Sequence, residues 1–218
     1  MYREWNPDAL QRRITLRPRL NIIWAEPTEQ GAGGHAAGKT TFCRFLRYLL
    51  GDPNYGSETF RDAFRRKFPN AWLVGEVHLD GEQWLVARFI GITGSPHWSA
   101  RGVGFERRFD EHVERQTYAD FVRALHKAFI EPLPIDVLPG SGKAVEWAHL
   151  LAWLSRDQEA RYDHVLDWRF GYSGSGGLGD LHNADRTLLV RTALGLTQDG
   201  ELKARQDHMR ILRDKAEC

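Results

Sequence analysis

The clearest pattern of apolar and polar positions along the chain is a pair of β-rich runs, residues 71–79 and 82–90, on either side of Asp80-Gly81. Both runs are rich in valine, leucine and aromatic residues, which favour strands. An Asp-Gly pair between two such runs favours the positive backbone angles of a two-residue type I′ turn. We therefore expect an antiparallel β-hairpin here.

Apolar residues recur at helical spacing in several other segments. The best defined is 41–50, where Phe42, Phe45, Leu46 and Leu49 share one face and Gly51 closes the helix. The segment 57–68 adds a candidate N-cap at Ser57 and apolar residues every four positions. Further helices are expected over 117–129, 145–154 and 187–196.

Two short strands are expected before the first helix. Residues 12–19 alternate polar and apolar side chains before a proline, which is typical of an edge strand, and residues 20–24 form a short apolar run. Residues 91–113 have no strong period. The tail, 201–215, is highly charged, and its apolar residues are so widely spaced that we expect none to be buried in a compact core. It could form the root of a coiled coil.

The sequence between the apolar run and the first helix carries the most specific motif in the chain. Residues 33–40 read G-x-x-x-x-G-K-[ST], in which Gly33 and Gly38 let the loop curl and aim its N–H groups at phosphate oxygens. Lys39 is expected near the β- and γ-phosphates and the Thr40 hydroxyl on Mg²⁺. The predicted nucleotide-binding residues are Gly33, Gly34, His35, Ala36, Ala37, Gly38, Lys39, Thr40 and Thr41.

The context of this motif favours a nucleotide site over a flexible surface loop. An apolar run precedes the loop and a helix follows it, so a helix N-terminus with its partial positive charge would face the anion. A second glycine-rich stretch, 140–143, lacks both a preceding apolar strand and a hydroxyl residue after Lys143. We interpret that stretch as a turn.

Composition limits the range of functions. The 218 residues carry a net charge of +1, which gives no global signal for binding a polyanion. The two cysteines allow neither a disulfide framework nor a zinc site. The N-terminus lacks the apolar segment of a signal peptide, and no apolar run is long enough to cross a membrane. We therefore expect a cytoplasmic protein.

Hydrolysis of a nucleotide requires a further carboxylate that orients Mg²⁺ and the attacking water, normally at the end of an apolar strand. The sequence contains no apolar run ending in Asp-Glu. The nearest approximations, Leu79-Asp80 and Ile135-Asp136, both lie in turn-like contexts. The chain therefore resembles half of an active site.

The order of elements is similar to the N-terminal part of ABC-type ATPase heads of the SMC/Rad50/RecN-like group. The residues that carry the resemblance are the run 20–24, the phosphate loop, the helix up to Gly51 and the following hairpin. The resemblance is specific across 14–90. It implies an α/β fold of the P-loop NTPase class, with a mixed sheet, an antiparallel β-hairpin subdomain at about 71–90 and flanking helices.

The same resemblance implies a division into a head lobe, residues 1–200, and a helical tail, 201–218. It places Gln158 near a Q-loop position, where the side chain would approach Mg²⁺ and the attacking water, although an exposed glutamine at a helix end is an equal alternative. Lys39 and Gln158 would then be the catalytic residues and Thr40 and Gln158 the Mg²⁺ ligands. The implied cofactors are ATP and Mg²⁺.

The implied partners are a C-terminal lobe that carries the missing motifs, a second head in a head-to-head homodimer, and DNA, in repair or in anti-phage defence. Two alternatives remain. The chain could be a stand-alone P-loop kinase, with the arginines of 101–115 as a lid. It could also be a nucleotide-binding interaction module that changes shape without hydrolysis.

Overall fold

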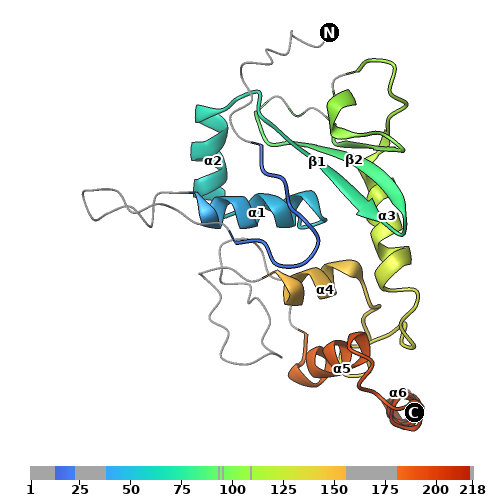
Figure 1. Cartoon of the computed structure of the whole chain (residues 1–218). Coiled ribbons are helices and arrows are strands. Elements are labelled where there is room, and N and C mark those ends of the chain that lie inside the picture. Colours follow the sequence, from blue (N-terminus) through green and yellow to red (C-terminus); the bar gives the residue numbers. More distant parts are fainter. Residues whose placement is uncertain are drawn as a thin grey trace.

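The computed structural model describes residues 13–22, 38–92, 94, 96–108, 110–155 and 181–216. In these residues the chain forms six α-helices and a four-stranded antiparallel sheet in the order β1-β2-β3-β4. Figure 1 shows α1 and α2 beside the hairpin, with α4, α5 and α6 successively farther from the sheet. The mixed α/β class that the sequence predicts is confirmed.

The predicted hairpin supplies the two longest strands of the sheet. β1 (Trp72–Leu79) pairs with β2 (Glu82–Phe89) in a register that places Leu79 opposite Glu82. Asp80 and Gly81 between them have φ angles of 51° and 79°, as a type I′ turn requires. β3 (Trp98–Arg101) and β4 (Gln116–Thr117) extend the sheet beyond β2. The sequence did not predict β3, which is only four residues long and follows a glycine-rich stretch.

The two faces of the sheet bury different clusters. On one face, Trp84 and Val86 of β2 pack in the main core with Leu49 of α1 and Phe121 of α3. On the other face, Leu85 packs with Ala100 and with residues that follow β3. The helices α1 and α3 therefore cover the same face of the hairpin.

The helices begin and end close to the predicted positions. Ser57 caps α2 by accepting a hydrogen bond from the Phe60 N–H at 3.3 Å. α5 begins earlier than its apolar spacing predicted. The bounds are α1 (Lys39–Leu49), α2 (Glu58–Lys67), α3 (Tyr118–Phe129), α4 (Trp147–Leu154), α5 (Asn183–Ala193), α6 (Asp199–Ala216) and a short 3₁₀ helix, η2 (Phe105–Arg107).

The two strands expected before the phosphate loop are wrong wherever the structure describes them. Residues 13–22 have no regular secondary structure, and Leu20 and Ile22 are 83% and 76% exposed. All pairings in the described sheet are antiparallel, so the expected mixed sheet is also wrong for the described residues. A buried strand of a parallel sheet needs hydrogen-bonding neighbours, and no described strand pairs with this segment.

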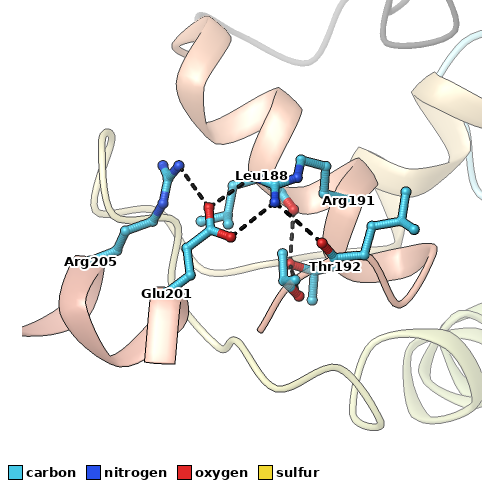
Figure 2. A network of polar contacts seen from close by, with 7 residues as sticks. Leu188, Arg191, Thr192, Glu201 and Arg205 are labelled. Atoms are coloured by element: carbon cyan, nitrogen blue, oxygen red, sulfur yellow. Dashed lines mark hydrogen bonds and ion pairs between the residues drawn. The ribbon is translucent and has the colours of Figure 1, made fainter. Parts of the chain in front are cut away.

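The charged tail forms α6, and its first turn is anchored to α5. Figure 2 shows Glu201 accepting hydrogen bonds from both terminal nitrogens of Arg191, at 2.8 and 2.9 Å, and from Arg205 at 3.1 Å. Leu202 is buried, which corrects the expectation that no apolar residue of the tail would enter the core. Its burial depends on the α5–α6 turn, because that turn directs the first turn of α6 back onto the core.

Candidate nucleotide site

The part of the phosphate-loop pattern that the structure describes, residues 38–40, lies at the start of α1. Gly38 has φ 72° and ψ 15°, the left-handed conformation that glycine adopts without a steric cost. Its carbonyl accepts the Phe42 N–H at 2.8 Å, so the helix begins directly after this glycine with Lys39 as its first residue. The first turn of α1 contains no acidic residue. This helix end is therefore compatible with an anion.

The structure brings only part of the predicted site together. Gly38, Lys39, Thr40 and Thr41 follow one another through the first turn of α1, and Lys39 and Thr40 are half-buried. Gly33, Gly34, His35, Ala36 and Ala37 lie outside the described residues, as does Gln158. The predictions for those six residues stay predictions.

No second set of Mg²⁺ ligands accompanies Thr40 in the described part of the chain. Those residues contain no group of three or more His, Cys, Asp or Glu side chains that could hold a metal ion. Asp80 lies in the exposed hairpin turn and Asp136 is also exposed. The Thr40 hydroxyl is the kind of ligand that binds Mg²⁺ beside phosphate oxygens. Thr40 would therefore hold the ion only together with a bound nucleotide.

Close packing holds α1 against the hairpin. The Leu49 side chain lies against Gly75 of β1, where an added Cβ would come within 2.2 Å of Leu49 Cδ2. Phe45 packs against the rings of Tyr55 and Phe64, with centroids 5.5 and 5.2 Å away. A larger residue at position 75 would therefore require the Leu49 side chain to move.

The C-terminal end of α1 is held by side chains from three other elements. Arg88 of β2 donates from Nη1 to the Tyr48 carbonyl and, at 2.7 Å, to the Asp52 carbonyl. The Tyr118 hydroxyl of α3 donates to the Leu49 carbonyl at 3.1 Å, and Trp147 Nε1 of α4 donates to the Leu50 carbonyl at 2.6 Å. We call Arg88, Tyr118 and Trp147 the socket of α1.

Arg88 and Trp147 of the socket are buried, Tyr118 is half-buried, and aromatic rings surround the Arg88 guanidinium. The Arg88 guanidinium lies 3.3 Å from the Tyr48 ring centroid and 4.5 Å from that of Tyr118. Burial is the main cause that raises the pKa of Tyr118 to about 12, so its hydroxyl remains a donor at neutral pH. These residues were not predicted from the sequence. The one local signal was a charged Arg88 inside the apolar run 84–90, where a buried cation requires partners.

The glycine-rich stretch interpreted as a turn forms a loop that binds a carboxylate within the chain. The bridge between Val137 and Ala144 closes the loop, and Gly142 has φ 68°. The Gly140 and Ser141 N–H groups each donate to one carboxylate oxygen of Asp185, both at 2.7 Å. Asp185 is in the first turn of α5 and is buried. This loop therefore holds α5 in place.

Two grooves lie elsewhere on the surface. One of about 450 Å³ lies between the hairpin and α3 and includes Trp84, Arg101 and Lys127. The other, of about 620 Å³, lies beside α2 and includes Arg65 and His97. Lys39 and Thr40 line neither groove. The assignment of the candidate nucleotide site depends on the conformation of the α1 N-terminus and on the sequence motif.

Two histidines, the half-buried His97 and the buried His149, predict how stability depends on pH. Burial is the largest cause that lowers the pKa of His97, and the charge of Arg88 lowers it further. Burial is also the largest cause that lowers the pKa of His149, although the negative charges of Glu146 and Asp185 oppose this shift. Each ring accepts a backbone N–H at Nδ1, from Phe89 and Glu146 respectively, both at 3.0 Å. Protonation at Nδ1 would remove that acceptor, so the folded protein favours the neutral ring.

The stabilisation from these neutral rings is complete above the unfolded histidine pKa of about 6.5 and decreases as the pH falls through that value. We expect a lower urea midpoint at pH 5.5 than at pH 7.5, measured by circular dichroism. His149→Gln should reduce the difference between the two pH values, whereas His112→Gln, on an exposed loop, should leave it unchanged. An equal midpoint at both pH values in the wild-type protein would contradict this account.

Comparisons with protein-family models, with curated proteins and with solved structures found no match to this chain. The described residues also include no helix with the length and apolar character needed to cross a lipid bilayer. The interpretation as an ATPase head therefore depends on the motif, the order of elements and the local geometry of α1.

Proposed function

We propose that this chain binds Mg-ATP and acts as the N-terminal half of an SMC/Rad50-like ATPase. One observation carries the proposal: α1 begins directly after a left-handed Gly38, with Lys39 and Thr40 in its first turn and no acidic residue beside them. A backbone of this form, at a positive helix end, suits the charged oxygens of a triphosphate. The antiparallel hairpin that follows α1 agrees with the order of elements in such heads.

Each residue of the site has a specific role in this proposal. The Lys39 ammonium would neutralise charge on the β- and γ-phosphates, and the N–H groups of residues 33–38 would donate to their oxygens. Thr40 would hold the metal ion, which supplies the charge stabilisation needed for phosphoryl transfer. Gln158 would orient the attacking water. The further carboxylate that hydrolysis requires would come from a C-terminal lobe.

The exposed segment before the loop supports the need for such a lobe. Leu20 and Ile22 are large apolar side chains that are almost fully exposed, and Leu16 is 45% exposed. Clustered exposed apolar residues mark surfaces that other protein covers. Head-to-head dimerisation around ATP and action on DNA follow by analogy with such ATPases, not from this site itself.

The proposal predicts nucleotide binding without turnover by the chain alone. Calorimetric titration with Mg-ATP should give saturable binding, because the phosphate-binding residues belong to this chain. A phosphate-release assay on the same sample should give no signal above buffer, because the second carboxylate is missing. Saturable binding without phosphate release is the expected combined result.

Two other results would overturn parts of this proposal. If the chain does not bind Mg-ATP, the assignment of the α1 N-terminus as a nucleotide site is wrong. Phosphoryl transfer from ATP to a small-molecule acceptor by the purified chain would favour the stand-alone kinase. A Thr40→Val variant is the matched control, because it keeps the side-chain shape but removes the hydroxyl, and it should weaken the dependence of ATP binding on Mg²⁺.

A further inference from the structure

The helix that starts at the candidate nucleotide site ends in the socket. α1 has 11 residues, so its two ends are about 16 Å apart at the usual helical rise. A short helix held by packing along its length moves as a rigid body, because its internal hydrogen bonds are stronger than its contacts with other elements. A small axial shift at Lys39 would therefore reach the carbonyls at the other end.

The donors in the socket are directed at the last carbonyls of α1, so an axial shift of the helix would change their hydrogen bonds. The last carbonyls of a helix have no partners within it and carry its partial negative charge. Arg88 and Tyr118 donate to Tyr48 and Leu49, and Trp147 donates to Leu50 at 2.6 Å. Hydrogen bonds lose strength steeply with length and angle, so these contacts fix the axial position of α1.

Trp147 also connects α1 to two other helices. It is the first residue of α4, and its ring stacks on Phe129 at the end of α3, with centroids 4.9 Å apart and an interplanar angle of 27°. The indole ring lies against Gly51, where an added Cβ would be 3.1 Å from Nε1. Movement of the α1 terminus would thus change the position of Trp147 relative to α3 and α4.

We propose that the socket is a positioning device for the nucleotide site. Arg88, Tyr118 and Trp147 fix the position of α1, and this keeps Lys39 and Thr40 where they can contact the phosphates. Mg-ATP binding at the opposite end of α1 changes the Trp147–Leu50 hydrogen bond. This inference rests on the proposed function and names how that site is coupled to the rest of the chain. Because the coupling is reciprocal, weakening the socket must weaken nucleotide binding.

The test uses the full chain labelled with 5-fluorotryptophan and observed by ¹⁹F NMR. The sequence has eight tryptophans, and Trp147→Phe assigns one resonance by its loss. Titration with Mg-ATP should shift the Trp147 resonance along the binding curve. Trp98 is the internal control, because it packs under Arg115 in the cluster on the face of the sheet opposite α1, and its resonance should move less.

Conservative variants separate positioning from simple structural support. Trp147→Phe removes the N–H donor but keeps a ring against Phe129, and Tyr118→Phe removes only the hydroxyl. Each should weaken Mg-ATP binding by about fivefold, the effect of losing one hydrogen bond of ordinary strength, in protein that remains folded by circular dichroism. Trp98→Phe should leave the affinity unchanged. A lower melting temperature with unchanged ATP affinity would mean that the socket is only structural.

The outcomes also separate this inference from the proposed function. If Mg-ATP binds but neither the Trp147 resonance nor the affinity of the socket variants changes, the coupling is wrong and the site assignment stands. If the wild-type chain binds no Mg-ATP, both are wrong.

Discussion

Replacement of Asp185 with asparagine is expected to lower the free energy of unfolding by about 3 kcal/mol. The buried carboxylate accepts one N–H on each oxygen, from Gly140 and from Ser141, both at 2.7 Å. Asparagine has the same shape but only one oxygen, so its NH₂ group would face a backbone N–H with no acceptor between them. Urea unfolding monitored by circular dichroism should show a lower midpoint with an unchanged slope.

Asp62→Asn is the matched control for this change. Asp62 is exposed on α2, 3.8 Å from Arg65, and surface pairs of this kind contribute little. Its midpoint should stay close to that of the wild type. If Asp185→Asn unfolds at the same urea concentration as the wild type, the loop 140–142 does not depend on the carboxylate and does not hold α5 as described.

Elements with strong local signals could be predicted from the sequence. Asp80-Gly81 determined the hairpin because both residues tolerate positive φ angles, and Ser57 marked the start of α2 because its side chain caps the helix. Phe121 and Leu125 likewise predicted the buried face of α3. In these cases the conformation depends on residues a few positions apart, which a single sequence contains.

Features that depend on distant contacts could not be predicted in the same way. Residues 20–22 have strand-like composition but are exposed, because a strand forms only when another strand supplies its hydrogen bonds. Leu202 is buried because the turn after α5 brings it back to the core. The short strand β3 forms through its pairing with β2 and β4, since its own residues carry little strand signal.

The candidate site and its surroundings likewise contain residues that a local motif identifies and residues that only the fold brings together. Gly38, Lys39 and Thr40 are consecutive, so a motif identifies them. The socket residues Arg88 and Trp147 are separated by almost sixty positions in the sequence, and only the fold brings them to the same helix end. Asp185 is a similar case, because no local pattern indicated that a glycine-rich loop more than forty residues earlier would bind its carboxylate.

Lys39→Ala is expected to reduce the affinity for Mg-ATP by about 100-fold. Hydrogen bonds to charged groups contribute up to about 3 kcal/mol, and each 1.4 kcal/mol corresponds to a factor of ten in affinity. Lys39 is half-buried at the first position of α1, and alanine favours helix, so the variant should fold as the wild type does. Lys143→Ala removes the same charge from the loop that holds Asp185 and should leave the affinity for ATP unchanged.

The most direct test of the nucleotide site is therefore a calorimetric titration of Mg-ATP into the wild-type chain, Lys39→Ala and Lys143→Ala under the same conditions. We expect saturable binding to the wild type and to Lys143→Ala, and binding about 100-fold weaker, or none, to Lys39→Ala. Equal affinities for the wild type and Lys39→Ala, or no binding to any of the three, would contradict the assignment of the α1 N-terminus as a phosphate site.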